Sequence, residues 1–209
     1  MRRTLANTEK TVPLEEQMNR LAFEKCIPLN VTLELTLVCN LRCVHCYNFD
    51  RETPYPKASY AKELQEDEVL KLIDEVHAEG CLNLTFTGGE ALLHPSLNTF
   101  THYARAKHMM VTIKTNGTLL DRKRLDKLLS AGVNRFDLSL YGATAQIHDT
   151  FTLEPGSFHK TITAVKLIRE ADLPLALNFC LTRHNGHEVQ EMLALGEKLD
   201  ATVNIDPQI

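Results

Sequence analysis

The sequence lacks any apolar run long enough to cross a membrane and any excess of basic residues. Its longest apolar stretches are strand-length and are interrupted by Thr, Asn or Glu, and the opening Met1-Arg2-Arg3-Thr4 is not followed by the apolar region of a secretory signal. Lys and Arg number 23 against 27 Asp and Glu, so the net charge is -4, and the two signs are interspersed. Because a phosphate backbone calls for a basic stripe, nucleic acid is not an expected partner. These features predict a cytoplasmic protein with no membrane partner.

Cysteine is too scarce for a disulfide scaffold. The chain of 209 residues has 6 cysteines, and three of them lie between positions 39 and 46. Such clustering indicates a metal or redox site in a reducing compartment. The scattered Cys26, Cys81 and Cys180 are expected to act as small buried hydrophobic residues.

Short strand candidates alternate with helical segments along most of the chain. Apolar residues recur at helical spacing between the strand candidates, in segments that end at Gly80 and Gly132, for example. This alternation predicts βαβ units and a parallel sheet. The six predicted strands cover 31–38, 82–87, 110–115, 134–141, 173–181 and 202–206.

The expected fold is therefore α/β, a partial (β/α)6 TIM-like barrel of parallel strands. The hydrophobic content of 44% is sufficient for the core of one such domain, which we place at 31–209. Residues 1–30 form an N-terminal extension with one amphipathic helix, because Leu14, Met18, Leu21 and Ala22 recur at helical spacing. The stretch 48–61 is predicted to be a long loop, a length more often associated with function than with simple connection.

One face of every predicted strand is polar. Parallel strands are normally covered on both faces, so this polar face needs an explanation, and a wet, functional barrel interior provides one. One alternative is an antiparallel sheet with a solvated face, which the intervening helices disfavour. Another is an internal ion-pair network of Glu34, Lys114, Arg135 and Asp137, which is compatible with a binding cavity. The polar residues are Thr32, Glu34, Thr36, Asn83, Thr85, Thr87, Thr112, Lys114, Asn116, Arg135, Asp137, Ser139, Asn178, Thr202, Asn204 and Asp206.

Three cysteines follow the first predicted strand directly. Cys39, Cys43 and Cys46 are spaced by four and three residues, so that one loop can wrap around a compact metal centre. Thiolates are soft ligands that favour iron-sulfur clusters, zinc or copper. A cubane cluster needs four ligands, so three cysteines leave one iron open to a non-protein ligand. The alternative is a zinc site completed by His45 or by a distant ligand.

The C-x3-C-x2-C pattern after the first strand of a β/α chain resembles the signature of the radical SAM superfamily, with His45 in the position usually held by an aromatic residue. This resemblance implies a 4Fe-4S cluster on Cys39, Cys43 and Cys46, whose open iron binds S-adenosylmethionine (SAM). It also implies that an electron from the cluster cleaves SAM, and that the resulting 5′-deoxyadenosyl radical abstracts hydrogen from a substrate. The electron donor would be a protein such as ferredoxin or flavodoxin.

The segment after the second strand, Gly88-Gly89-Glu90, resembles the GGE motif of that family. The two glycines allow a close approach of the backbone to a ligand. The resemblance implies that Glu90 binds the amino group of SAM through charge-assisted hydrogen bonds. Taken alone, the same residues are a turn followed by an acidic residue at a helix start.

Three further polar residues are predicted to contact the cofactor. Asn116 follows the third strand, Ser139 ends the fourth and Asn178 lies on the fifth. Similar enzymes bind the carboxylate or ribose hydroxyls of SAM there, whereas the alternative for each is a polar residue satisfied by its neighbours. Several of these positions fall at C-terminal strand ends, the face on which β/α barrels build active sites.

The segments around Leu138–Gly142, His148-Asp149 and Pro155–Phe158 resemble the peptide-modifying branch that carries a C-terminal SPASM domain. Ser157 also suits a helix N-cap. The cysteine-rich segment of that branch is not present in this sequence. The predicted function is modification of a peptide or protein side chain, with a ribosomal precursor peptide as a candidate partner.

Several alternatives stay open. One is a radical SAM enzyme of cofactor or haem biosynthesis that acts on a small molecule. Another is a truncated, inactive barrel fragment with an open edge strand. A third is a structural zinc protein that binds a metabolite. Candidates for the substrate side of the barrel are Glu34, Lys114, Arg135, Asp137 and Tyr141.

Overall fold

A computed structural model describes residues 12–47 and 63–207, so the predicted loop at 48–61 lies outside the described residues. Six strands form one sheet in the order β1-β2-β3-β4-β5-β6, and every neighbouring pair is parallel. The predicted α/β fold is confirmed, and the antiparallel alternative is wrong. The strands are β1 (Asn30–Glu34), β2 (Asn83–Thr87), β3 (Met110–Thr115), β4 (Arg135–Ser139), β5 (Leu175–Leu181) and β6 (Thr202–Pro207).

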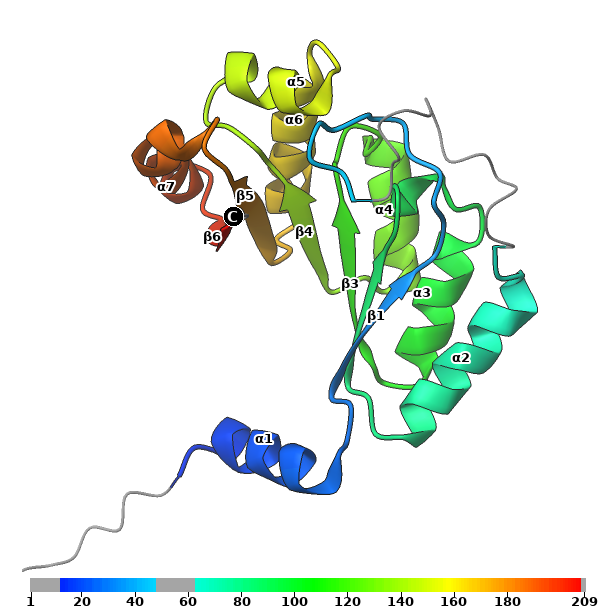
Figure 1. Ribbon diagram of the computed structural model, residues 1–209. Helices are drawn as coiled ribbons and strands as arrows, with labels where there is room; N and C mark the ends of the chain where they lie inside the picture. Colours follow the sequence, from blue (N-terminus) through cyan, green and yellow to red (C-terminus); the bar gives the residue numbers. More distant parts are fainter. Residues whose placement is uncertain (1–11, 48–62, 208–209) are drawn as a thin grey trace, which may run out of the picture.

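Helices connect successive strands and lie on the outer side of the curved sheet (Figure 1). The arrangement is a partial barrel whose inner face is polar. None of the described helices is both long and apolar enough to span a bilayer. The helices are α1 (Leu14–Lys25), α2 (Glu66–Ala78), α3 (Leu97–Ala106), α4 (Arg122–Ala131), α5 (Ala145–Thr152), α6 (Ser157–Glu170) and α7 (Val189–Lys198), with short 3-10 helices η1 (Ala91–Leu93) and η2 (Gly186–Glu188).

The alternation of polar and apolar residues in the strands is an alternation of burial. In β2, β3 and β4, every second residue is buried against the helices, and most of the residues between them are part-buried or exposed on the inner face. The aromatic centre of this core is Phe86, Phe100, Phe136 and Phe179, all fully buried. Burial of these side chains is the main stabilising contribution to the barrel.

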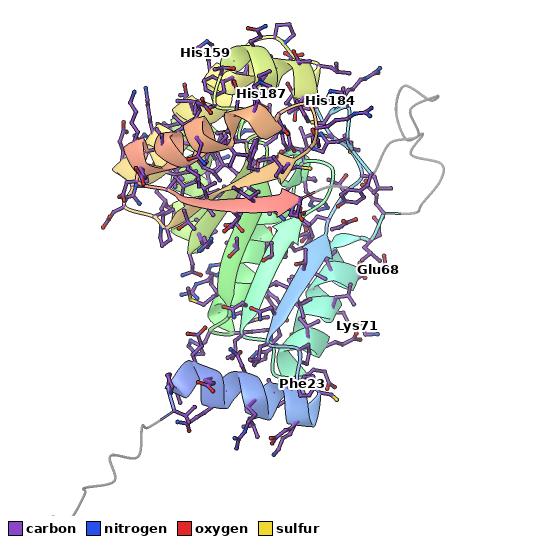
Figure 2. The ribbon with its side chains drawn as sticks, turned by 60° about the vertical axis from the view of Figure 1, so that its left-hand side comes forward. Phe23, Glu68, Lys71, His159, His184 and His187 are labelled. Atoms are coloured by element: carbon purple, nitrogen blue, oxygen red, sulfur yellow. The ribbon has the colours of Figure 1, made fainter. Side chains whose placement is uncertain are left out.

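Helix α1 forms where the sequence predicts it, but it stands apart from the barrel. It lies beyond the N-terminal ends of the strands in both views (Figure 1, Figure 2). Ala22 is its only buried residue, whereas Leu14 and Phe23 are 71% and 87% exposed. The chain turns at Cys26, whose left-handed backbone ends the helix. The boundary between an extension and a barrel near residue 30 stays a prediction.

Two strands end earlier than predicted. β1 ends at Glu34 instead of Val38, because the Thr36 hydroxyl turns the chain by accepting from the Val38 N–H at 3.0 Å and donating to Glu63 at 2.6 Å. β4 ends at Ser139 instead of Tyr141. The shortening leaves both segments free to form loops at the C-terminal edge of the sheet.

The prediction that Ser157 caps a helix is wrong. Ser157 is the first residue of α6, and Gly156 occupies the N-cap without a side chain. The capping is done from α5 instead, where the Asp149 carboxylate accepts hydrogen bonds from the N–H groups of Gly156 at 2.6 Å and Phe158 at 2.8 Å. Asp149 thereby joins α5 to α6.

Candidate metal and cofactor site

The cysteine loop follows β1 and is docked onto the end of α5. The Val44 N–H donates to the Phe151 carbonyl at 2.8 Å, and the Arg42 N–H donates to that of Thr152 at 3.3 Å. Leu41 is buried beneath the loop. Backbone hydrogen bonds and one apolar anchor therefore fix the loop at the C-terminal edge of the sheet, where the sequence places it.

The three thiols of this loop lie within electrostatic range of one another. Burial is the main cause that raises the pKa of Cys39 to about 11 and that of Cys43 to about 12. The neighbouring cysteines raise the pKa of Cys43 further, since each thiolate disfavours a second one. The protein alone therefore keeps the thiols of Cys39 and Cys43 protonated, and a bound metal centre would supply the positive charge that deprotonates them.

The donor set fits the implied cluster. In the parts of the chain that the structure describes, no three His, Cys, Asp or Glu side chains converge closely enough to hold one metal ion. In a cubane, by contrast, each thiolate binds a different iron, so that the cysteines surround the centre instead of meeting at one point. Cys39, Cys43 and Cys46 would hold such a cluster and leave its fourth iron open.

The Gly88-Gly89 segment packs against the backbone that leads into the cysteine loop. A Cβ on Gly88 would lie 2.3 Å from the Thr36 carbonyl oxygen, and one on Gly89 would lie 2.4 Å from that of Val38. The Gly89 N–H donates to Thr36 O at 2.7 Å. Backbone atoms of residues 35–38, and not a ligand, therefore occupy the space next to the Cβ positions of Gly88 and Gly89. Contacts of the two glycines with the cofactor stay a prediction.

Glu90 is a buried carboxylate that joins three segments. One oxygen accepts from the Leu92 N–H at 3.0 Å and the Thr115 hydroxyl at 2.5 Å, and the other accepts from the Asn116 N–H at 2.8 Å. Burial, the largest cause, raises the pKa of Glu90, and these hydrogen bonds oppose the shift. Glu90 therefore ties η1 to the end of β3. Its predicted contact with the amino group of SAM is untested.

Asn116 lies beside the first cysteine, as the convergence of strand ends predicts. Its Nδ2 is 4.0 Å from the Cys39 Sγ and donates to the Asn40 Oδ1 at 3.0 Å. Its Oδ1 accepts from the Thr118 N–H at 2.9 Å. The backbone N–H of Leu41 also points to the Cys39 sulfur, at 3.4 Å. Two donors therefore face this sulfur, an arrangement that tunes iron-sulfur clusters.

His45 packs on an aromatic group formed by Tyr141 and Phe151. The ring centroids of His45 and Tyr141 are 4.4 Å apart with an edge-on geometry, and those of His45 and Phe151 are 5.5 Å apart. The Tyr141 side chain lies close enough to Ser139 and to the Cys43 thiol for both to influence its pKa. Burial, followed by the charge of Cys43, raises the pKa of Tyr141. Sequence reasoning assigned Tyr141 to the substrate side and missed its contact with a cysteine.

Ser139 and Asn178 are register partners on β4 and β5. The Asn178 Oδ1 accepts from the Asn204 amide at 3.0 Å. Its Nδ2 is buried and has no hydrogen-bond partner among the described residues. Because buried donors are nearly always paired, this amide suits a ligand acceptor such as a carboxylate or a ribose hydroxyl.

Sequence reasoning also missed Glu63. Its carboxylate accepts from the Leu37 N–H at 3.1 Å as well as from the Thr36 hydroxyl. Glu63 precedes α2 and holds the chain just before Cys39. No sequence signal distinguishes it from the other acidic residues at the start of that helix.

Comparison with known proteins gives three kinds of similarity. Residues 33–196 match the model of the Radical SAM superfamily. The chain is 36% identical over 174 residues to the AdoMet-dependent heme synthase of Methanosarcina barkeri, covering 83% of this chain and 48% of that protein. It is 31% identical over 175 residues to the PqqA peptide cyclase of Granulibacter bethesdensis, covering 84% and 46%. The crystal structure of Streptococcus suis SuiB has the same fold, with a TM-score of 0.72 at 15% identity, covering 93% of this chain and 44% of that one. The chain spans about half the length of the curated relatives it matches.

Proposed function

Because the chain belongs to the radical SAM superfamily, we propose that it binds a 4Fe-4S cluster through Cys39, Cys43 and Cys46 and cleaves SAM reductively. The observation that carries this proposal is the loop on which three mutually interacting thiols are fixed at the C-terminal strand ends. When bound, the cluster supplies the electron that cleaves SAM and so starts hydrogen abstraction. An electron-donor protein such as ferredoxin or flavodoxin would reduce it.

The residues of this chain hold and orient the two groups. Gly88 and Gly89 allow β2 to support the backbone before Cys39, and Glu90 fixes the Asn116 backbone beside it. The Asn178 amide offers a buried donor for a polar group of SAM. The packed rings of His45 and Tyr141 would shield a bound cluster from water on that side.

We infer that the substrate is a small carboxylated tetrapyrrole of haem synthesis. Support comes from the 36% identity to an AdoMet-dependent heme synthase and from 30% identity over 178 residues to the Fe-coproporphyrin III synthase of Methanosarcina barkeri. The peptide substrate favoured by the sequence is the second candidate. It is supported by the PqqA peptide cyclase similarity.

The cluster is tested by anaerobic reconstitution with iron and sulfide. We expect charge-transfer absorbance and acid-labile sulfide in the wild-type chain, and their loss in a variant with Ala at Cys39, Cys43 and Cys46. A Cys26→Ala variant is the matched control, because Cys26 is an exposed cysteine at the end of α1, which corrects the burial predicted for it from the sequence. Protein that binds zinc and no sulfide would overturn the proposal in favour of the zinc alternative.

The reaction is tested with the reconstituted chain, dithionite and SAM. The expected product is 5′-deoxyadenosine, measured by liquid chromatography, in amounts that rise when Fe-coproporphyrin III is added. A rise with a glutamate-containing peptide and none with the porphyrin would favour the second candidate. No nucleoside product from a fully loaded cluster would contradict SAM cleavage by this chain.

A further inference from the structure

The inner face of the barrel carries charged residues that no described ion-pair network neutralises. Of the four residues considered for such a network, only Arg135 and Asp137 pair, with 2.7 Å between Nε and Oδ1. The Glu34 carboxylate instead accepts from the Tyr47 hydroxyl at 2.7 Å. Within residues 12–47 and 63–207, Lys114 makes no hydrogen bond and no ion pair. The four residues therefore do not form a closed ion-pair network, and the Lys114 ammonium group has no anionic partner among the described residues.

The strand register places this cation beside the ion pair. Lys114 on β3 is the register partner of Asp137 on β4, and Thr112 is that of Arg135. All four lie on the inner face, since their neighbours Ile113 and Phe136 are buried in the core, and side chains on adjacent strands are about 5 Å apart at the backbone. Two cations thus flank one carboxylate, and the group has a net positive charge within a chain of net charge -4.

This charged group lies below the proposed cofactor site on the same face. Asp137 and Ser139 are two residues apart on β4, a rise of roughly 7 Å, and Ser139 and Cys43 both lie near the Tyr141 side chain. On the next strand, the register partner of Asp137 is Ala176, a small and fully buried residue. A molecule held here would extend upward towards the site of radical formation.

We propose that Lys114 and Arg135 form a subsite that binds a carboxylate of the substrate. The proposal rests on the proposed function and specifies its substrate class, an anion with at least one carboxylate. Arg135 offers its remaining N–H groups, since among the described residues it bonds only to Asp137, and Lys114 offers an ammonium group with no competing partner. The planar guanidinium of Arg135 beside the ammonium group of Lys114 suits the two oxygens of a carboxylate.

The test measures binding of coproporphyrin III, a fluorescent tetracarboxylate, to the 209-residue chain. We expect Lys114→Met to weaken binding by roughly tenfold to a hundredfold, the effect of losing one charge-assisted hydrogen bond. Asp137→Asn should have the opposite sign, tightening binding by about two- to tenfold, because it removes a competing carboxylate and releases Arg135. A role in folding alone would not produce opposite effects on affinity. Lys123→Met, at an exposed lysine of α4, is the matched control and should bind as the wild type does.

A second arm separates the two sources of a carboxylate. A peptide rich in glutamate is compared with its glutamine counterpart, and a Lys114-dependent preference for the glutamate peptide would assign the subsite to a peptide. The proposal is overturned if Lys114→Met binds both probes as the wild type does, or if the wild type binds neither. Cluster absorbance and the melting temperature of each variant report separately that the fold persists. SAM cleavage by the wild type is measured without either probe, so its failure would contradict the proposed function and leave the binding result standing.

Discussion

His148 is buried between aromatic rings beneath the cysteine loop. Its ring stacks on Tyr141 with centroids 5.6 Å apart and meets Phe158 edge-on at 5.8 Å. The Nδ1 accepts from the Tyr141 N–H at 3.1 Å, so the neutral imidazole is the form that fits. Burial lowers the pKa of His148 from 6.5 to about 4. The packing below the cysteine loop therefore depends on the protonation state of His148.

We predict that His148 makes the fold sensitive to mild acid. Between pH 6.5 and 4, the unfolded chain binds a proton at this residue and the folded chain does not. The contribution to stability is fully present above pH 6.5 and is lost as the pH falls to about 4, a change of about 3 kcal/mol. Urea unfolding at several pH values should show this loss in the wild type, relative to a His148→Phe variant that keeps an aromatic ring.

The wild type must be compared with the His148→Phe variant because Glu90 changes the stability in the opposite direction as the pH falls. Its raised pKa gives stability that is present below the ordinary value of 4.5 and lost as the pH rises. Both proteins retain Glu90, so the difference between their curves isolates His148. His159→Phe, at the exposed histidine labelled in Figure 2, should follow the wild type. Parallel curves for the wild type and His148→Phe would refute the prediction.

Glu90 gives a second prediction at this scale. In Glu90→Gln, an amide NH2 replaces one carboxylate oxygen and leaves a buried backbone donor, that of Leu92 or Asn116, without an acceptor. An unsatisfied buried donor costs about 1 to 3 kcal/mol. Chemical denaturation at pH 8 should show a loss of this size, and the exposed control Glu197→Gln should change stability by less than about 0.5 kcal/mol. Equal stability of the two variants would mean that the Glu90 hydrogen bonds do not hold η1 to β3.

The contact between β2 and the cysteine loop is tested at the scale of elements. In Gly89→Ala, the new methyl group would lie 2.4 Å from Val38 O and 2.6 Å from Leu37 O, so the backbone before Cys39 must move. Overpacking of this kind costs about 1 to 3 kcal/mol. Because the moved segment carries the first cysteine, we expect the iron content after reconstitution to fall at least by about half, measured by colorimetric iron assay.

Gly156→Ala is the control for the element-scale prediction. Gly156 has a left-handed backbone with φ of 83°, but a Cβ there meets no atom within 4 Å. The substitution should cost about 1 to 2 kcal/mol through backbone strain and leave the iron content unchanged. If both variants lose iron equally, general destabilisation is the cause, and the specific contact with the loop is not.

The elements themselves could be predicted from the sequence, because their signals are local. Alternation of side chains fixes β2, β3 and β4, and Gly132 ends α4 as a left-handed C-cap. The contacts that position the site are not local. Glu63 reaches the Thr36 hydroxyl 27 residues away, and Asp149 caps a helix from the preceding one. A spacing pattern has no information on such pairs, since they depend on how the loops close in space.

The same difference applies to the site residues. The convergence of Cys39 and Asn116 follows from the parallel topology, which brings all C-terminal strand ends to one edge. By contrast, the burial of Glu90 and the contact between Tyr141 and Cys43 depend on side-chain packing. The resemblance to the GGE motif suggested a ligand contact for Glu90, whereas its three internal donors became visible only in the structure.

On the scale of the whole molecule, the barrel and α1 differ in how they are held. The barrel has a continuous core shared by strands and outer helices, whereas α1 contributes only Ala22 to buried surface. The connection is made by Ile27, whose side chain packs at Gly80. A segment with so little buried apolar area opens at little cost in free energy. The barrel should therefore fold without it.

We predict that a chain beginning at Ile27 keeps the thermal stability of the full chain. Removing residues 1–26 deletes the exposed apolar side chains of α1 and retains the contact of Ile27 with Gly80. The melting temperature, measured by circular dichroism, should change by less than about 3 °C, which corresponds to roughly 1 kcal/mol in a chain of this size. A chain beginning at Asn30 lacks Ile27 as well and should melt at a lower temperature than the first variant. A large drop already in the first variant would show that α1 stabilises the barrel, and the boundary predicted near residue 30 would then be wrong.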